Sequence, residues 1–284
     1  MNTKQVPAYL AYQFKDNDAS VNAFDEMPLW SAAFGLLLLN HLEIKAGSIV
    51  IDIGSGTGFP LFELAGRCGN TTKLYGIDPW KNACLRAEEK LKQYGYTNVG
   101  ILNQSADKLP FSNDSIDLIV SNLGINNFAN RKEVFNECNR VLKPGGKLAL
   151  TTNLNGHWNT FYQIFKDSLI ELNLTRYLPA LKEEEEHRGN IQSIGGLFTN
   201  AGFKIQSYQE DLFKMKFVNG TAFLNHHFVK LGWLGSWLSL IDKQDQTLVF
   251  TILEENLNKS VALQEGFQLQ VPMLYMEGVK TESY

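Results

Sequence analysis

The feature that most constrains this chain is an apolar strand that runs directly into a glycine-rich turn. Residues 49–60 read Ile-Val-Ile-Asp-Ile-Gly-Ser-Gly-Thr-Gly-Phe-Pro. An apolar run of this length is typical of a strand covered on both faces, as in a parallel sheet. Gly54, Gly56 and Gly58 allow a tight turn that brings bare backbone against a ligand before the next helix. Open α/β sheets bind nucleotides at this end of their strands.

The acid in this strand, Asp52, indicates which ligand the turn can hold. A carboxylate two residues before the first glycine would repel a pyrophosphate, but not a ligand with a cationic head. The spacing agrees, because the dinucleotide pattern Gly-x-Gly-x-x-Gly needs glycine at position 59, where this chain has Phe59. Taken alone, the turn still leaves open a nicotinamide or flavin site, or a tight turn without a ligand.

Composition favours a soluble globular protein with one large domain or two small ones. The chain has 284 residues, 44 % of them apolar, which is ordinary for a soluble protein. A net charge of −4 gives no electrostatic footprint for nucleic acid, so we expect no nucleic-acid partner. The longest apolar stretch, around 36–39, is far short of the ~20 residues that span a bilayer. Oligomeric state has no signal in the sequence.

The cysteines argue for a cytoplasmic protein without a metal site. Cys68, Cys84 and Cys138 lie far apart, with no CxxC pair and no neighbouring histidine. An odd count at such spacings is typical of reduced thiols and not of disulfides or zinc ligands. The N-terminus lacks a basic region followed by an apolar core, so we expect no signal peptide.

Alternating strand and helix patterns predict an α/β fold. In the first 152 residues, strands at 48–53, 73–77, 98–102, 116–120 and 147–152 alternate with helices at 28–42, 59–68, 79–94 and 131–141. Such alternation implies right-handed crossovers and a doubly wound parallel sheet. Two later strands, at 203–208 and 268–277, complete a Rossmann-like, mostly parallel sheet of seven strands, and we expect the helical insertions to form a lid.

Further motifs follow the glycine turn in a fixed order. Asp78 ends the second strand, where a carboxylate can accept hydrogen bonds from both ribose hydroxyls of an adenosine; it can also cap the helix that begins at Pro79. Then come Ala-Asp-Lys-Leu-Pro-Phe at 106–111, a strand opening with Asp117, and Arg-Val-Leu-Lys-Pro-Gly-Gly at 140–146. With the strand ending Asp-x-Gly-x-Gly-x-Gly, these motifs closely resemble the class I S-adenosylmethionine-dependent methyltransferases, in particular small-molecule members of the type 11-like kind.

The resemblance covers residues 49–152, is weaker at 195–203, and implies S-adenosylmethionine as cofactor and S-adenosylhomocysteine as product. In that family the Ala-Asp pair after the third strand meets the adenine, and Asp117 is at the wrong end of its strand for a ligand and therefore structural. The implied cofactor-binding residues are Asp52, Gly54, Ser55, Gly56, Gly58, Asp78, Ala106, Asp107 and Asn122.

We expect one methyltransferase domain, 1–284, with its segments in distinct roles. Residues 1–47 form an N-terminal arm and a helix, and the arm packs on another part of the protein, with a place over the cofactor as one option. Residues 48–153 form the cofactor-binding core, and 188–211 and 266–284 complete it. The helical insertions, 154–187 and 212–265, are the predicted lid.

The acceptor side is less defined by sequence. The Asn/Asp-Pro-Pro-aromatic signature of amino-group methyltransferases and a nucleophilic cysteine are both absent after the fourth strand. Substrate-binding candidates are Asn126 and Asn127, for which loop capping is an equal alternative, and Arg188, which can instead pair with the preceding glutamates. Catalytic candidates are His157, Tyr162 and His226, with His157 as the first base to test and a structural histidine as the alternative.

The predicted function is methyl transfer to a small, fairly apolar molecule by in-line attack on the sulfonium methyl. The aromatic segment 222–241 either lines a lid or forms a helix pair that packs on itself. Two alternatives stay open: a methyltransferase acting on RNA or protein, and a non-catalytic protein that binds S-adenosylmethionine.

Overall fold

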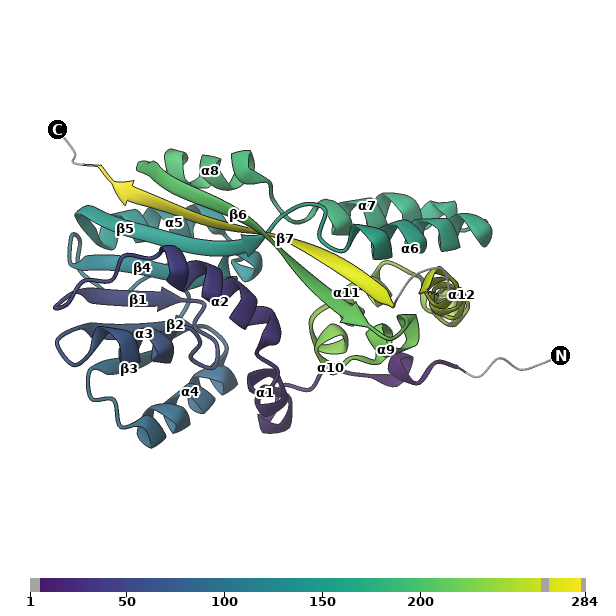
Figure 1. Ribbon diagram of the computed structural model, residues 1–284, viewed down its shortest axis with the longest axis horizontal. Coiled ribbons are helices and arrows are strands. Elements are labelled where there is room, and N and C mark those ends of the chain that lie inside the picture. Colours follow the sequence, from purple (N-terminus) through teal and green to yellow (C-terminus); the bar gives the residue numbers. More distant parts are fainter. Residues whose placement is uncertain (1–5, 262–265, 282–284) are drawn as a thin grey trace. The chain divides into compact units, whose positions relative to one another are not determined.

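The computed structural model describes residues 6–261 and 266–281, which divide into two compact units (Figure 1). The sheet unit comprises Asp16–Leu154, Gly189–Asp211 and the described residues from Met273 onward. The helical unit comprises the described residues up to Lys15, Asn155–Arg188, and the described part of Leu212–Pro272. It therefore contains most of the two insertions expected from the sequence, together with the start of the N-terminal arm.

A seven-stranded mixed sheet forms the frame of the fold, with strand order β3-β2-β1-β4-β5-β7-β6. The first five strands pair in parallel, and β7 runs antiparallel to β5. This confirms the predicted Rossmann-like, mostly parallel sheet. The strands are β1 Ile49–Ile53, β2 Lys73–Asp78, β3 Val99–Asn103, β4 Ile116–Asn122, β5 Leu142–Asn153, β6 Phe203–Phe217 and β7 Phe267–Lys280.

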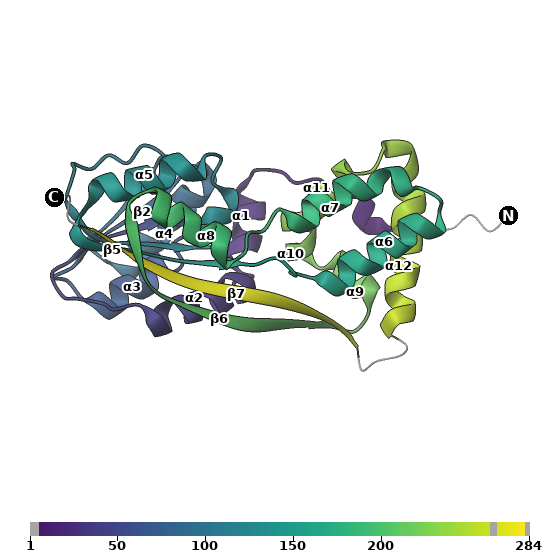
Figure 2. The ribbon, with the colours of Figure 1, turned by 90° about the horizontal axis from the view of Figure 1, so that it is seen from above.

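Helices cover both faces of the sheet within the sheet unit. Figure 2 shows α5 and α8 on one side and α2 and α3 on the other. On the first side, alternate residues of β1 and β4, such as Ile51 and Ile119, pack against Phe135 and Phe198 in one apolar core. The helices are α1 Asp18–Asp25, α2 Leu29–His41, α3 Leu61–Cys68, α4 Lys81–Tyr94, α5 Arg131–Val141 and α8 Ile191–Asn200, with a short 3-10 turn, η2 Gly124–Asn127.

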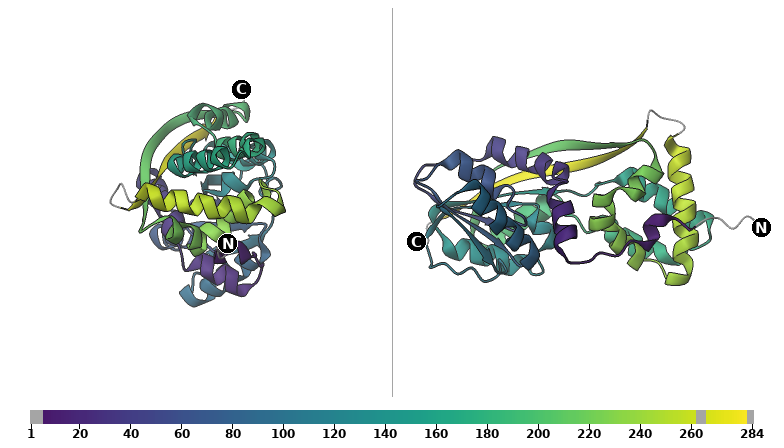
Figure 3. Two further views of the ribbon diagram at one scale, coloured as in Figure 1. Left: turned by 90° about the vertical axis from the view of Figure 1, so that its right-hand side faces the viewer. Right: turned by 90° about the horizontal axis from the view of Figure 1, so that it is seen from below.

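The helical unit is built around aromatic side chains. Trp158, Phe161, Phe165, Phe223 and Trp237 are all fully buried, and their rings meet edge-to-face or tilted, the arrangements that aromatic pairs favour. The longest helix, α12, is seen as the yellow-green helix in Figure 3. The elements of the helical unit are η1 Ala8–Ala11, α6 Asn159–Glu171, η3 Thr175–Tyr177, α7 Leu178–Glu186, α9 Gly220–Asn225, α10 His227–Val229, η4 Lys230–Leu234, α11 Gly235–Ser239 and α12 Lys243–Val261.

One predicted boundary is wrong. The sequence predicts a helical segment that begins at residue 212, but in the structure β6 continues to Phe217. In this stretch Phe213, Met215 and Phe217 are partly buried, while the residues between them are exposed. That period of two is a strand pattern and identifies the correct element. The expected turn at 143–146 also lies inside β5, as an irregularity in its pairing with β4.

Candidate cofactor site

The glycine turn is fixed to the end of the neighbouring strand. The backbone amides of Gly54 and Ser55 donate hydrogen bonds to the Ile77 carbonyl, at 2.8 and 3.2 Å. Gly54, Gly56 and Gly58 all have positive φ angles, of 74°, 51° and 103°, which favour glycine. A Cβ atom at Gly54 would also lie only 2.8 Å from the Cα of Gly124 in η2. The turn therefore requires glycine for conformation and for space.

The Asp78 carboxylate joins this turn to the start of the next helix. One oxygen accepts a hydrogen bond from the Gly56 amide and the other from the Trp80 amide, both at 2.8 Å. Burial raises the pKa of Asp78. The two amide hydrogen bonds oppose this effect but do not cancel it, so the pKa stays above its ordinary value. The prediction that Asp78 caps a helix beginning at Pro79 is wrong: α4 begins at Lys81 with Trp80 as its N-cap residue and no side-chain cap, and Asp78 instead binds the amide of Trp80. An ionised carboxylate has about four acceptor positions, so two stay available for ligand hydroxyls.

Asp52 is an acidic side chain inside the core of the sheet unit. Its side chain is fully buried, and neither oxygen has a hydrogen-bond partner of normal geometry among the described residues. Burial, and then the negative charge of Asp78, raise its pKa to about 8, while the Leu61 amide at the start of α3 has only a small opposing effect. A buried carboxylate without a partner is costly, so this position favours a ligand that brings positive charge.

The loop that holds Ala106 and Asp107 is anchored by two residues of α5. Ala106 is buried and Asp107 is exposed. The Arg140 guanidinium donates to the carbonyls of Leu109 and Phe111, at 3.0 and 2.8 Å, and also binds the Glu137 carboxylate. Glu137 in turn accepts from the Leu109 amide at 2.9 Å. Sequence reasoning assigned the segment beginning at Arg140 only to a turn, and so missed these two positioning residues.

Two asparagines, Asn122 at the end of β4 and Asn126 in η2, bind the end of β5. Asn122 donates from Nδ2 to the Ser31 carbonyl at 3.0 Å and accepts from the Thr151 hydroxyl at 2.7 Å. Asn126 binds the side chains of Thr152 and Asn153 in the same way, whereas Asn127 is exposed. Two of the three predicted asparagines are thus partly occupied by contacts within the protein.

The remaining candidates lie in the helical unit. His157 is buried and stacks on Trp158, with ring centroids 4.4 Å apart. Burial, and then the positive charge of Arg188, hold the pKa of His157 well below its ordinary value. Tyr162 is buried too and accepts a hydrogen bond from the Trp237 indole at 3.4 Å. The structure therefore brings His157, Tyr162 and Arg188 into one electrostatic environment.

His226 packs against an aromatic neighbour. Its ring meets Phe217 edge-on at 5.5 Å, and burial, followed by the charges of His227 and Lys230, lowers its pKa. Within 222–241, Phe223, Val229 and Trp237 are buried, Phe223 and Trp237 pack on each other, and Trp237 also packs on Phe161 of α6. This is the self-packing arrangement that the sequence left open beside a lid, and a lid role for the segment stays a prediction.

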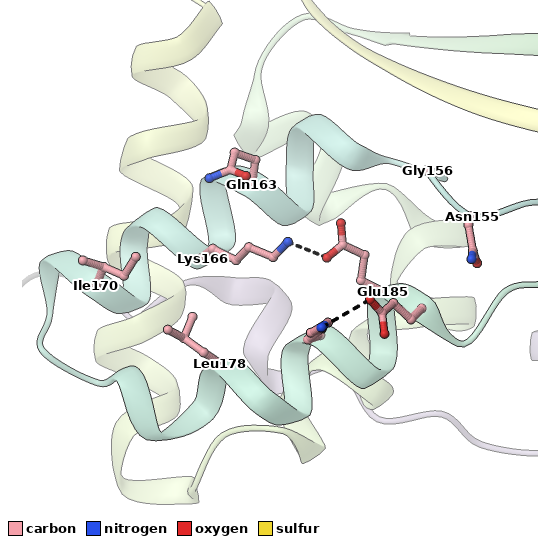
Figure 4. Close-up of a pocket in the computed structure, with 9 residues that line it drawn as sticks. Asn155, Gly156, Gln163, Lys166, Ile170, Leu178 and Glu185 are labelled. Atoms are coloured by element: carbon pink, nitrogen blue, oxygen red, sulfur yellow. Dashed lines mark ion pairs between the residues drawn. The ribbon is translucent and has the colours of Figure 1, made fainter.

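A cavity of about 540 Å³ in the helical unit contains none of the predicted site residues (Figure 4). It lies against α6 and α7, where Lys166 pairs with Glu185 and Lys182 with Glu186. Its lining is Asn155, Gly156, Gln163, Lys166, Ile170, Leu178, Lys182, Glu185 and Glu186. Both lysines of this lining thus pair with glutamates of α7.

Two further observations concern the whole described part of the chain. Within residues 6–261 and 266–281, no three or more His, Cys, Asp or Glu side chains come together as a metal site, and none of the described helices is long and apolar enough to cross a membrane. Asp117 accepts from the Ile49 amide at 2.8 Å and pairs with Lys143, which confirms its structural role.

The fold and the glycine turn define an S-adenosylmethionine-dependent methyltransferase. Residues 44–195, more than half of the chain, match the methyltransferase domain family, and the chain belongs to that family. A demethylmenaquinone methyltransferase of Bacillus subtilis is 26 % identical over 207 residues, which are 69 % of this chain and 87 % of that protein.

Two other similar proteins are also methyltransferases. A demethylmenaquinone methyltransferase of Bacillus velezensis is 30 % identical over 137 residues, covering 48 % of this chain and 57 % of that protein. The crystal structure of an S-adenosylmethionine-dependent methyltransferase from Aquifex aeolicus has a TM-score of 0.52 at 21 % identity, over 69 % of this chain and 92 % of that one. The latter similarity is one of fold.

Proposed function

We propose that this methyltransferase binds S-adenosylmethionine at the glycine turn and transfers its methyl group to a small apolar molecule. The observation that supports the cofactor best is the buried carboxyl group of Asp52, two residues before Gly54, which has no hydrogen-bond partner of normal geometry among residues 6–261 and 266–281. A cationic ligand compensates such a charge, whereas a phosphate repels it. The other polar groups of the site suit the remaining parts of this cofactor, its adenosine and its methionine tail.

Each predicted contact has a physical basis in the sheet unit. The two remaining acceptor positions of Asp78 suit the ribose hydroxyls, and the Ala106–Asp107 loop, held by Arg140, suits the adenine edge. The Ser55 hydroxyl has no partner among the described residues, and Asn122 keeps one N–H for the methionine end of the cofactor.

The chemistry asks little of the protein beyond alignment. Bound S-adenosylmethionine would supply an electrophilic methyl group and leave S-adenosylhomocysteine as product. The chain has to hold the acceptor in line and to take up its proton where it has one. His157 is our proposed base; burial and Arg188 lower its pKa, which keeps the imidazole neutral and also makes it a weaker proton acceptor than an exposed histidine. The raised pKa of Tyr162 keeps its phenol protonated, and His226 is the second choice.

The names of two relatives support a small apolar acceptor, because both are demethylmenaquinone methyltransferases and demethylmenaquinone is a small apolar quinone. The acidic net charge of −4 also disfavours RNA. We place Asn126, Asn127 and Arg188 among the groups that contact the acceptor.

The test is turnover with methyl-labelled S-adenosylmethionine and three acceptor pools: demethylmenaquinone, total RNA and a protein extract. We expect S-adenosylhomocysteine to form and label to enter demethylmenaquinone. Label found only in RNA or protein would contradict the acceptor class. Cofactor binding by calorimetry without S-adenosylhomocysteine in any pool would instead identify a non-catalytic binding protein.

A further inference from the structure

Helix α1 is fastened to α4 by a largely buried ion-pair cluster. The Asp25 carboxylate lies 2.6 Å from Nζ of Lys90 and 3.0 Å from Nε of Arg86. The side chains of Asp25 and Lys90 are only 12 % and 13 % exposed. Burial raises the pKa of Asp25, but Lys90, Thr57 and Arg86 outweigh it, so that the net pKa is lowered. Removing one partner of such a buried pair leaves a desolvated charge behind.

The same helix reaches the cofactor site at two points. The Thr57 hydroxyl, in the glycine turn, lies near enough to Asp25 to lower the pKa of its carboxyl. The ring of Phe24 comes within 4.0 Å of where a Cβ atom at Gly56 would stand. Phe24 also meets the Trp80 ring edge-on, with centroids 5.7 Å apart. Because Gly56 and Trp80 are the two residues whose amides bind Asp78, these rings lie beside the proposed ribose acceptor.

The beginning of this segment is fixed as well. The Asp16 carboxylate accepts hydrogen bonds from the Trp80 indole at 2.7 Å and from Nδ2 of Asn82 at 2.9 Å. Residues 16–25 are therefore attached at both ends to the stretch that follows β2. They also precede residue 44, where the match to the methyltransferase domain family begins.

We propose that residues 16–25 form a strap that completes the cofactor pocket, with Phe24 and Trp80 as an aromatic wall for the adenosine and Asp25 as the positioning residue that holds the strap closed. The inference rests on the proposed function, because it assumes that the glycine turn binds S-adenosylmethionine. A further consequence is that the cofactor can enter the pocket, and the product can leave it, only when the contacts between α1 and α4 break.

The test compares two substitutions that each remove one acidic partner of Arg86. Asp25→Asn breaks the buried cluster, while Glu89→Gln removes a carboxylate that lies 3.2 Å from Arg86 and is 67 % exposed. Dissociation rates and Kd values for S-adenosylmethionine and S-adenosylhomocysteine are measured by stopped-flow mixing and calorimetry. We expect Asp25→Asn to raise both quantities about tenfold, and Glu89→Gln to change them less than twofold.

A second variant makes the test independent of folding. Phe24→Leu leaves all the ion pairs in place and removes the aromatic wall, and we expect it too to raise the dissociation rate several-fold. If the wild-type protein binds both ligands and neither Asp25→Asn nor Phe24→Leu changes their dissociation, the strap is refuted and the proposed function stands. If the wild-type protein binds neither ligand, the proposed function fails and the strap fails with it.

Discussion

The Gly56 amide donates a 2.8 Å hydrogen bond to the Asp78 carboxylate, across a separation of 22 residues. Because the other oxygen of Asp78 holds the Trp80 amide, one side chain sets both the glycine turn and the start of the segment leading into α4. The turn is thus shaped by the same carboxylate that is proposed to bind the ribose, so cofactor affinity and turn geometry depend on each other.

Replacing Asp78 by asparagine should weaken cofactor binding by about 1–3 kcal/mol, the range for removing a charged acceptor from a buried hydrogen-bond network. The amide keeps one oxygen, but its NH₂ group faces a backbone N–H that it cannot satisfy. Calorimetric titration with S-adenosylhomocysteine measures the change. Glu88→Gln, on the exposed surface of α4, is the control and should bind normally. Unchanged affinity in Asp78→Asn would refute the ribose assignment.

Cofactor affinity should depend on pH through Asp52. Its pKa is raised to about 8 in the folded chain, so the carboxyl is mostly neutral near pH 7, and a cation favours the ionised form. We expect affinity for S-adenosylmethionine to rise as pH increases from about 6 to 8, by at most tenfold per unit for one linked proton. S-adenosylhomocysteine, which lacks the sulfonium charge, should respond less. Titrations across this range with wild type and Asp52→Asn measure the effect, and a slope retained in the variant would exclude Asp52.

The same pKa has a consequence for stability without the cofactor. Between about pH 4 and 8 the folded chain holds a proton on Asp52 that the unfolded chain has lost. The free energy of unfolding should therefore fall as pH rises through this window, as far as Asp52 contributes. Asp52→Asn should remove this part of the dependence and raise the melting temperature of the apo protein at pH 8. Thermal unfolding at pH 6 and pH 8 provides the comparison.

Two glycines with similar backbone angles separate conformational strain from steric exclusion. Gly54 and Gly95 have φ angles of 74° and 71°, but a Cβ atom at Gly95, the left-handed residue that follows α4, meets nothing within 4 Å, whereas one at Gly54 meets the Gly124 backbone. Gly95→Ala should cost about 1–2 kcal/mol of unfolding free energy from strain alone. Gly54→Ala should cost more and also lower cofactor affinity. Denaturant titrations and calorimetry test both, and equal effects at the two positions would contradict the steric argument.

A role of His157 as the base predicts a loss of turnover larger than its loss of stability. We expect His157→Gln to reduce kcat by about 10²–10⁴-fold, the usual contribution of a general base, with cofactor Kd unchanged. Because the ring stacks on Trp158, the melting temperature should fall as well. A lower melting temperature with unchanged kcat would assign His157 to packing alone.

The sheet and the cofactor turn could be read from the sequence because both depend on local patterns. The apolar run of β1, the positive-φ glycines and the acid that ends β2 each follow from residues within a few positions of one another. The extension of β6 to Phe217 was available too, in the alternation of Phe213, Met215 and Phe217, but a neighbouring aromatic-rich stretch favoured a helix. Long-range contacts had no such signal: nothing adjacent to Arg140 indicates that it holds the carbonyls of Leu109 and Phe111.

By itself the sequence determined the class of fold and the position of the glycine turn, since backbone conformation is carried by single residues, and the charge of Asp52 led to the hypothesis of a cationic ligand. Only the tertiary structure decided which charges are buried and paired. Among the described residues neither Asp52 oxygen has a hydrogen-bond partner of normal geometry, whereas Asp25 has Lys90 and Arg86, and no spacing along the chain distinguishes the two. Desolvation and ion pairing depend on what surrounds a group in three dimensions, so the strap formed by residues 16–25 could be inferred only from the folded chain.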